Sequence, residues 1–120
     1  AAAGKTLDTL PADQRDQPEA AALRGHLYFA ERASGAPDAG ELERRLESDA
    51  DDNEARLQLA FLKVLERDYE PAIELLLELM KRDRGFGDDA GRDGLVRLFD
   101  LLGDDPLVGR YRRRMASLLY

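Results

Sequence analysis

The most informative absence in this 120-residue sequence is cysteine. Without a thiol, the chain cannot form a disulfide, use a thiolate nucleophile or bind zinc through cysteine. The sequence also contains a single histidine, His26, which excludes a metal site built from several histidines of this chain. We therefore expect no metal and no other cofactor.

Residues that favour β-strands are also scarce. The chain has three valines, one isoleucine and no tryptophan, and no segment alternates apolar and polar residues for long enough to predict a strand. No run approaches the ~18 apolar residues that a membrane-spanning helix needs, so we expect no membrane partner. Leucine, alanine, glutamate, aspartate and arginine dominate instead, and most of these residues favour helices.

Basic residues are fewer than acidic residues in this chain. The chain has 18 Lys and Arg residues against 25 acidic residues, which gives a net charge of −7. This balance argues against a nucleic-acid partner, because surfaces that bind nucleic acids are normally basic. At 120 residues, 43% of them hydrophobic, the chain can bury enough surface to form one core. Its composition favours a cytoplasmic, non-enzymatic binding module.

Capping residues and stop signals divide most of the chain into six predicted helices, 16–34, 38–49, 53–67, 70–83, 88–102 and 105–119. Four of these helices have a predicted N-cap, namely Asp16, Asp38, Asn53 and Asp105. The apolar residues at helical spacing in the first helix are Ala20, Leu23, Leu27 and Ala30. Helices 53–67 and 70–83 are apolar on nearly every side, which places them at the centre of the domain.

Equivalent helix starts recur every 34 or 35 residues, which is the period of the tetratricopeptide repeat. The segment 53–86 fits this repeat best, because Leu59 and Ala60 form its large–small pair. One period after Ala60 stands Gly94, and one period before it stands His26, which is not small. We predict an all-α fold of antiparallel helix hairpins in a tetratricopeptide-like, right-handed superhelix. Its expected parts are the end of a preceding repeat with a linker (1–15), a degenerate repeat (16–49), the clear repeat (53–86) and a degenerate C-terminal helix pair (88–120).

Several segments in a fixed order resemble a more specific family. They are Asp68–Ala72, Glu74–Met80, Arg82–Phe86, Leu98–Gly103 and the C-terminal stretch Asp105–Tyr120. On these segments, the chain from Ala60 to Tyr120 resembles the C-terminal tetratricopeptide region of the bacterial chaperedoxins. These are thioredoxin-fold co-chaperones of the CnoX (YbbN) type. Thr6–Pro11 resembles the end of the preceding repeat in that family.

The resemblance implies that this chain is the C-terminal piece of a longer protein, whose thioredoxin-like domain and thiol chemistry lie outside these residues. It also implies protein clients and a chaperonin as partners, because the parent would hold unfolding clients and pass them to the chaperonin and Hsp70 systems. A tetratricopeptide scaffold or dimerisation module unrelated to chaperones is the alternative, and self-association into a homo-oligomer is left open. No catalytic constellation can be assembled, so we expect no enzymatic activity.

Two patterns that resemble catalytic or metal sites have simpler structural explanations. His26 is accompanied by no nucleophile motif, which predicts a structural or surface role. Asp49, Asp51 and Asn53 have the spacing of a calcium loop, but Glu54 occupies the position that requires glycine. We therefore expect an acidic turn followed by a helix cap.

The inner face of the clear repeat is one candidate binding surface. By analogy with peptide-binding tetratricopeptide proteins, the positions that line the groove are Glu54, Leu57, Phe61, Val64 and Leu65. Leu57 and Phe61 cannot supply the donors of a carboxylate clamp. These residues could form an apolar groove for exposed hydrophobic segments, or neighbouring helices could fill the groove.

Charge is concentrated in two places. The stretch 38–54 has eight acidic and two basic residues, a net charge of −6. It is either a solvated face or a surface that attracts a basic partner. The only basic cluster is in the last helix, at Arg110, Arg112, Arg113 and Arg114. The overall acidity argues against RNA there, and arginines near a helix C-terminus also interact favourably with the helix dipole.

The last helix is the second candidate binding surface. Its predicted buried stripe is formed by Val108, Tyr111, Met115 and Leu118, and its other side carries Arg110, Arg113 and Arg114. Arginine and aromatic residues together are enriched in interface hot spots. In the chaperedoxins this helix is the natural element for docking to the chaperonin. The hypothesis is that the partner-binding residues are Arg110, Tyr111, Arg113, Arg114, Leu118, Leu119 and Tyr120. The alternative is that the last three of these residues only complete the core.

Overall fold

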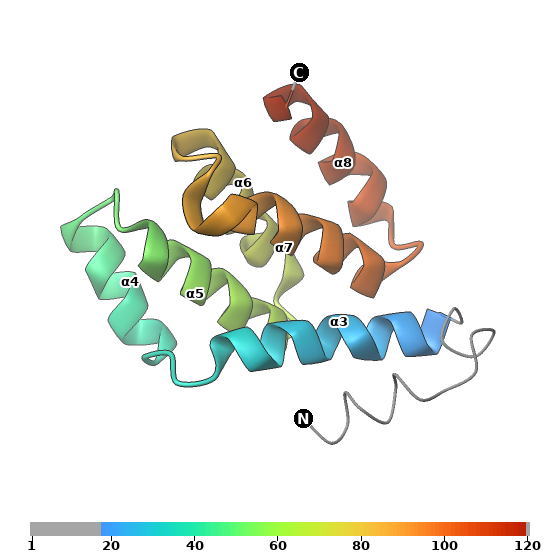
Figure 1. Cartoon of the computed structure of the whole chain (residues 1–120), viewed down its shortest axis with the longest axis horizontal. Coiled ribbons are helices and arrows are strands. Elements are labelled where there is room, and N and C mark those ends of the chain that lie inside the picture. The colour runs from blue at the N-terminus through green and yellow to red at the C-terminus, as the bar shows by residue number, and fades with distance from the viewer. Residues whose placement is uncertain (1–17, 120) are drawn as a thin grey trace.

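The computed structural model describes residues 18–119, and within this range the fold is all-α, as predicted (Figure 1). The six helices are α3 (Pro18–Ala33), α4 (Ala39–Ser48), α5 (Asn53–Leu65), α6 (Tyr69–Arg82), α7 (Phe86–Leu102) and α8 (Pro106–Leu119). Each coincides with a predicted helix to within two residues at either end. The prediction for 1–15, the Asp16 cap and the position of Tyr120 lie outside the described residues.

The helix starts follow the capping rules, with one correction. Asp38 is the N-cap of α4, and its carboxylate accepts a hydrogen bond of 2.8 Å from the backbone N–H of Glu41. The N-cap of α5 is Asp52 and not Asn53, because the Asp52 carboxylate accepts the N–H of Ala55 at 3.0 Å. Aspartate and asparagine are about equally good N-caps, so the sequence alone could not show whether Asp52 or Asn53 caps α5.

The hairpin of α5 and α6 forms the centre of the core, as predicted. Ile73, Leu76 and Leu79 of α6 are fully buried, and α6 is covered by α5 on one side and by α7 on the other. Leu95 and Leu98 of α7 are also fully buried and belong to the same cluster as Leu76. Burial on more than one side explains why α6 is apolar nearly all round.

Two glycines allow α7 to approach α6 closely. A Cβ at Gly94 would lie 3.2 Å from Leu76 Cδ2, and a Cβ at Gly91 would lie 3.0 Å from Met80 Cγ. Glycine in a helix interior costs about 1 kcal/mol relative to alanine. The close packing of the two helices compensates for this cost, and the small residue one period after Ala60 lies at this contact.

The start of α7 differs from the prediction. Gly87, Asp88 and Asp89 have positive φ angles of 60°, 57° and 64°, so regular right-handed helix continues only after Asp89. The prediction of a regular helix from Asp88 was therefore wrong at its first turn. Glycine adopts positive φ freely and aspartate tolerates it better than most residues, so this composition suits a left-handed turn between α6 and α7.

Helix α3 packs differently from the expected hairpin. It lies across α5 and α7, and these contacts far outweigh those with α4, which packs on α5 (Figure 1). The predicted apolar stripe of α3 was wrong in part, because Leu23 is 46% exposed while Phe29 and Ala33 are buried. Helix α8 packs mainly on α6. The division of the chain into repeats at 16–49, 53–86 and 88–120 stays a prediction.

The repeat period indicated a small residue at position 26 of α3. In the structure the small residue lies one position earlier, at Gly25. Gly25 is buried, and a Cβ there would lie 3.3 Å from Leu101 Cβ of α7. The adjacent His26, which the 34-residue step had reached, is exposed. Gly25 therefore provides the close approach between α3 and α7.

Candidate protein-binding surfaces

Helix α8 is bound to α6 by a ladder of polar contacts, which we call the α6–α8 ladder. Arg110 Nη2 lies 2.7 Å from Glu70 Oε1, and one helical turn later Arg114 Nη1 lies 2.7 Å from Glu74 Oε2. Between them, the Tyr111 hydroxyl donates a hydrogen bond of 3.0 Å to Glu74. Two arginines of the predicted basic cluster are therefore neutralised by carboxylates of the same chain.

The ladder changes the acid–base properties of the exposed Glu74 and the buried Tyr111. The hydrogen bond from Arg114 holds the pKa of Glu74 below its usual value, against the opposing effect of burial. Burial raises the pKa of the Tyr111 phenol, and the hydrogen bond that it donates to Glu74 acts in the same direction. At neutral pH Glu74 is thus an anion that holds both α8 side chains, and Tyr111 is a neutral donor.

The remaining predicted residues of α8 have different environments. Arg113 is exposed, and no ion pair joins it to any described residue. The Arg112 guanidinium lies 5.7 Å from the centre of the Phe99 ring. Leu118 and Leu119 are half-buried and pack against the core, so they are only partly available to a partner. Arg110 and Arg114, which were expected on the same outer side as Arg113, are exposed but bond to the α6 carboxylates Glu70 and Glu74.

A shallow groove of about 240 Å³ runs between α6 and α8. Leu77 and Leu118 provide its apolar lining, and Lys81 and Ser117 lie at its polar edge. At the same end of α8, the Arg84 guanidinium donates a hydrogen bond to the backbone carbonyl of Leu118. A cation at a helix C-terminus stabilises the unpaired carbonyls there, so Arg84 helps to hold the end of α8 in place.

The inner face of the clear repeat is largely covered by α3. The ring centres of Phe29 and Phe61 lie 5.5 Å apart, and Phe61 and Val64 are buried. Leu57 and Leu65 are half-buried against the same cluster. Of the five predicted groove residues, only Glu54 is exposed. Neighbouring residues therefore fill the groove at Phe61 and Val64, in line with the second of the two alternatives.

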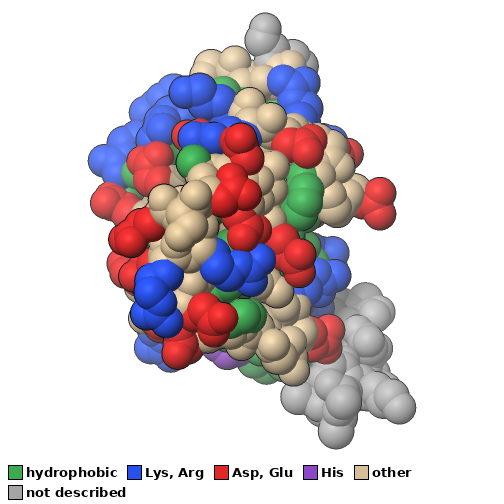
Figure 2. All heavy atoms as spheres, turned by 90° about the vertical axis from the view of Figure 1, so that its left-hand side faces the viewer, with side chains coloured by type: hydrophobic (Ala, Val, Ile, Leu, Met, Phe, Trp, Pro, Cys, Tyr) green, Lys and Arg blue, Asp and Glu red, His purple; other side chains and the backbone are tan. Residues whose placement is uncertain are grey.

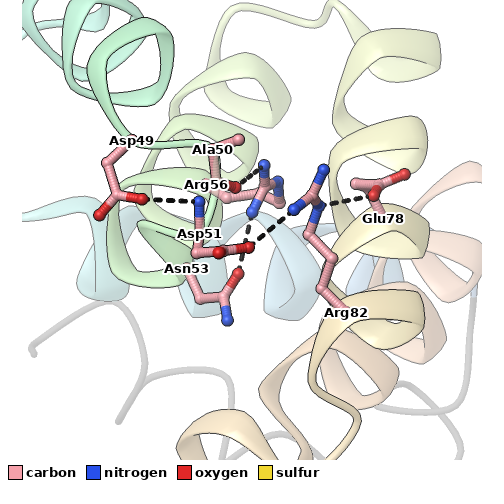
Figure 3. Close-up of polar contacts among 7 residues, drawn as sticks. All are labelled: Asp49, Ala50, Asp51, Asn53, Arg56, Glu78 and Arg82. Carbon is pink, nitrogen blue, oxygen red and sulfur yellow. Dashed lines mark hydrogen bonds and ion pairs between the residues drawn. The ribbon is translucent and has the colours of Figure 1, made fainter.

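The acidic turn at 49–53, whose spacing resembles that of a calcium loop, is part of an arginine network (Figure 3). Asp51 Oδ1 accepts a hydrogen bond of 2.8 Å from Arg82, which also donates to Glu78 at 2.7 Å. Arg56 donates to Asn53 Oδ1 at 2.9 Å and to the carbonyl of Ala50. The Asp49 carboxylate accepts the backbone N–H of Asp51. No group of ligand-type side chains in the described part of the chain could hold a metal ion.

The central residue of this network, Arg56, was not among the residues predicted from the sequence. Arg56 is only 6% exposed, and burial lowers its pKa, but its hydrogen bonds to the 50–53 turn compensate for the loss of water. The spacing carried a usable signal, because Arg56 precedes Leu59 and Ala60 by three and four residues and so shares their buried face. Together with Arg82, it connects the α4–α5 turn to α6.

Much of the acidic stretch 38–54 is also engaged within the chain. Arg45 Nε lies 3.0 Å from Asp52 Oδ2, and Lys63 Nζ lies 3.7 Å from Glu43. On the side of the molecule drawn in Figure 2, acidic and basic side chains are interspersed and the hydrophobic areas between them are small. This arrangement favours the solvated-face interpretation of the acidic stretch over a site for a basic partner.

These features define a helical-repeat protein that presents grooves and helix faces at its surface. Residues 32–120, more than half of the chain, match the family model described as Tetratricopeptide repeat. The chain therefore belongs to the tetratricopeptide repeat family, whose repeats generally mediate protein–protein interaction. No curated protein and no solved structure shows significant similarity to the chain. None of the described helices is long and apolar enough to cross a membrane.

Proposed function

We propose that this chain is the protein-binding module of a cytoplasmic, thioredoxin-like bacterial co-chaperone. In this proposal it holds unfolding clients and docks to the chaperonin or Hsp70 machinery, without any catalytic step. The observation that carries the proposal is the ordered set of chaperedoxin-like segments from Asp68 to Tyr120. Membership of the tetratricopeptide repeat family supports the general part of the proposal, which is protein binding.

The proposed docking element is the solvent-facing side of α8. The α6–α8 ladder fixes α8 on α6, so the solvent-facing side of α8 has a defined orientation before any partner binds. That side includes the exposed Arg113, and the end of the helix includes the half-buried Leu118 and Leu119. A preorganised helix face loses little conformational entropy on docking, which favours affinity.

The sharpest test is Arg113→Glu, measured by pull-down with purified chaperonin and by thermal melting. We expect chaperonin binding to fall while the melting temperature stays nearly unchanged, because no ion pair joins Arg113 to a described residue. Arg114→Glu is a poorer test, since it would place a carboxylate beside Glu74 and loosen α8 itself. Arg44→Glu, an exposed residue of α4, is the matched control for the change in charge.

Removal of Leu118–Tyr120 tests the apolar end of the same element. Loss of chaperonin binding with a small change in melting temperature supports docking through this end. Loss of binding together with a large fall in melting temperature shows that these residues complete the core. Full binding by a chain that carries both Arg113→Glu and the truncation would rule out α8 as the docking element.

Client holding separates the proposal from its alternative. A holdase suppresses the aggregation of a heated model client when the two are present at near-stoichiometric amounts, and light scattering measures this directly. A scaffold or dimerisation module has no such effect, and analytical ultracentrifugation would instead show a concentration-dependent dimer. Aggregation that proceeds unchanged in the presence of this chain would contradict the co-chaperone proposal.

A further inference from the structure

A groove between α3 and α7 differs from the α8 surface in both position and chemistry. It has a volume of about 470 Å³, and its walls include Tyr28 and Arg32 of α3 and Arg92, Val96 and Arg97 of α7. The close approach of the two helices at Gly25 and Leu101 holds the walls together. Two long helices therefore form a preformed groove with three arginines on its rim.

These three arginines differ from the four arginines of the described part of the chain that are paired with acidic residues. Arg45, Arg82, Arg110 and Arg114 each form an ion pair with a carboxylate. The structure records no ion pair for Arg32, Arg92 or Arg97 with any described residue, and all three are exposed. Their guanidinium N–H groups thus remain available for the bidentate bonds that arginine forms with carboxylates.

Tyr28 organises two of these cations. The Arg32 guanidinium carbon lies 3.6 Å from the centre of the Tyr28 ring, and that of Arg97 lies 5.1 Å from it. Arg32 is further fixed by a hydrogen bond of 3.3 Å to the backbone carbonyl of Tyr28. An arginine stacked on an aromatic ring keeps N–H groups in its own plane free for an acceptor. Because the side chains are ordered beforehand, less entropy is lost when an anion binds.

We propose that the α3–α7 groove binds an acidic, partly apolar segment of a partner polypeptide. Carboxylates of this segment pair with Arg32, Arg92 and Arg97. An aliphatic side chain of the segment covers Val96, which is 44% exposed, and the neighbouring edge of Tyr28. This surface is independent of the docking proposed for α8, and the inference does not rest on the partner being a chaperonin.

Two aspartates favour a polypeptide over a nucleic acid. Asp93 and Asp100 line the same groove, so a continuous polyphosphate backbone would place negative charge against them. A peptide can avoid both aspartates, because its carboxylates are separated by uncharged residues and can be placed opposite the arginines only. The two aspartates also provide partners for a basic residue within the peptide.

The test uses a short fluorescein-labelled peptide rich in Glu with a central Leu, titrated with the chain and followed by fluorescence anisotropy. A peptide with Gln in place of each Glu and an oligodeoxynucleotide of similar length are the comparison probes. We expect saturable binding of the Glu peptide that weakens with added salt, and no saturable binding of the other two probes. Saturation by the Gln peptide or by the oligonucleotide, equal to that of the Glu peptide, would overturn the proposal.

Single variants then locate the site. Arg32→Gln, Arg92→Gln and Arg97→Gln should each weaken binding of the Glu peptide by about three- to tenfold, because each removes one charge-assisted contact. Tyr28→Leu should weaken binding without changing the net charge. Arg44→Gln is the matched control and should bind as the unmodified chain does, since it removes the same charge from an exposed site on α4. Circular dichroism of each variant confirms the fold, and an effect of Arg44→Gln equal to the others would refute a defined site.

Discussion

The backbone of α7 at Gly94 lies against the side chain of Leu76 so closely that a methyl group would have both Leu76 methyls within 3.3 Å. Leu76 is fully buried, and protein interiors are close-packed. The two residues belong to different helices of the central core, and their contact sets the distance between α6 and α7. The packing of α7 against α6, and not the conformation of α7 itself, therefore limits the size of the side chain at position 94.

This contact predicts opposite effects for two glycine substitutions. Gly109→Ala in α8 meets nothing within 4 Å and should raise the free energy of unfolding by about 0.5–1 kcal/mol, the ordinary gain for a helix interior. Gly94→Ala should show no such gain, because overpacking costs about 1–3 kcal/mol and offsets it. Urea denaturation of both variants gives the comparison. Equal stabilisation at the two sites would show that α6 and α7 are not in close contact.

Truncation of Leu76 tests the centre of the core. Leu76→Ala should lower the free energy of unfolding by about 2–5 kcal/mol, because it leaves a cavity in a fully buried site. The surface control is Arg44→Ala, which should change stability by less than about half a kcal/mol. Arg45, an obvious control from its sequence, is unsuitable because it bonds to Asp52. Similar urea midpoints for the two variants would place the core elsewhere.

Two substitutions test whether Asp52 or Asn53 is the N-cap of α5. Asp52→Ala should lower the free energy of unfolding by about 1–2 kcal/mol, because it leaves the N–H of Ala55 without its acceptor and Arg45 without its partner. Asn53→Ala leaves that N–H capped and removes only the hydrogen bond that Arg56 donates to Asn53 Oδ1, so it should lower the stability less. Thermal melts of the two variants decide the assignment, and a larger loss at Asn53 than at Asp52 would restore the assignment made from sequence.

The pH dependence of stability should report on the carboxylates of Asp52 and Glu74. The pKa of Asp52 is lowered first by the N–H of Ala55 and then by Arg45, and the pKa of Glu74 is lowered first by Arg114. Their stabilising contributions are therefore complete above the carboxyl pKa of the unfolded chain, about 4, and are lost as the pH falls through the lower folded values. Melting temperatures measured from neutral to acid pH should fall in that window. In Asp52→Asn and Glu74→Gln chains the fall should be smaller.

The α6–α8 ladder should make the docking of α8 sensitive to salt. Exposed ion pairs are screened by added salt, whereas the buried contacts of Leu76 are not. Amide hydrogen exchange in α8 should therefore become faster in high salt and in Glu74→Gln, while exchange in α6 stays slow. Glu47→Gln, an exposed carboxylate of α4 with no recorded partner, is the control. Uniform exchange across α6 and α8 under all conditions would mean that the ladder does not hold the helix.

Local patterns determined the helices and the centre of the fold. Six helices, the cap at Asp38 and the central α5–α6 hairpin follow from spacing and capping chemistry, which act over a few residues. The requirement for a small residue at Gly94 follows from the period of the repeat. These features are predictable because each is decided within one turn, one helix or one repeat.

The tertiary structure alone decided which side chains remain available to a partner. Helix α3 is apolar around much of its surface, so its sequence could not show that Phe29 would cover Phe61 while Leu23 stayed exposed. The same holds for Arg110, whose partner Glu70 lies 40 positions earlier in the chain. A charge run looks uniform in sequence, because pairing across helices depends on how they pack and not on local spacing.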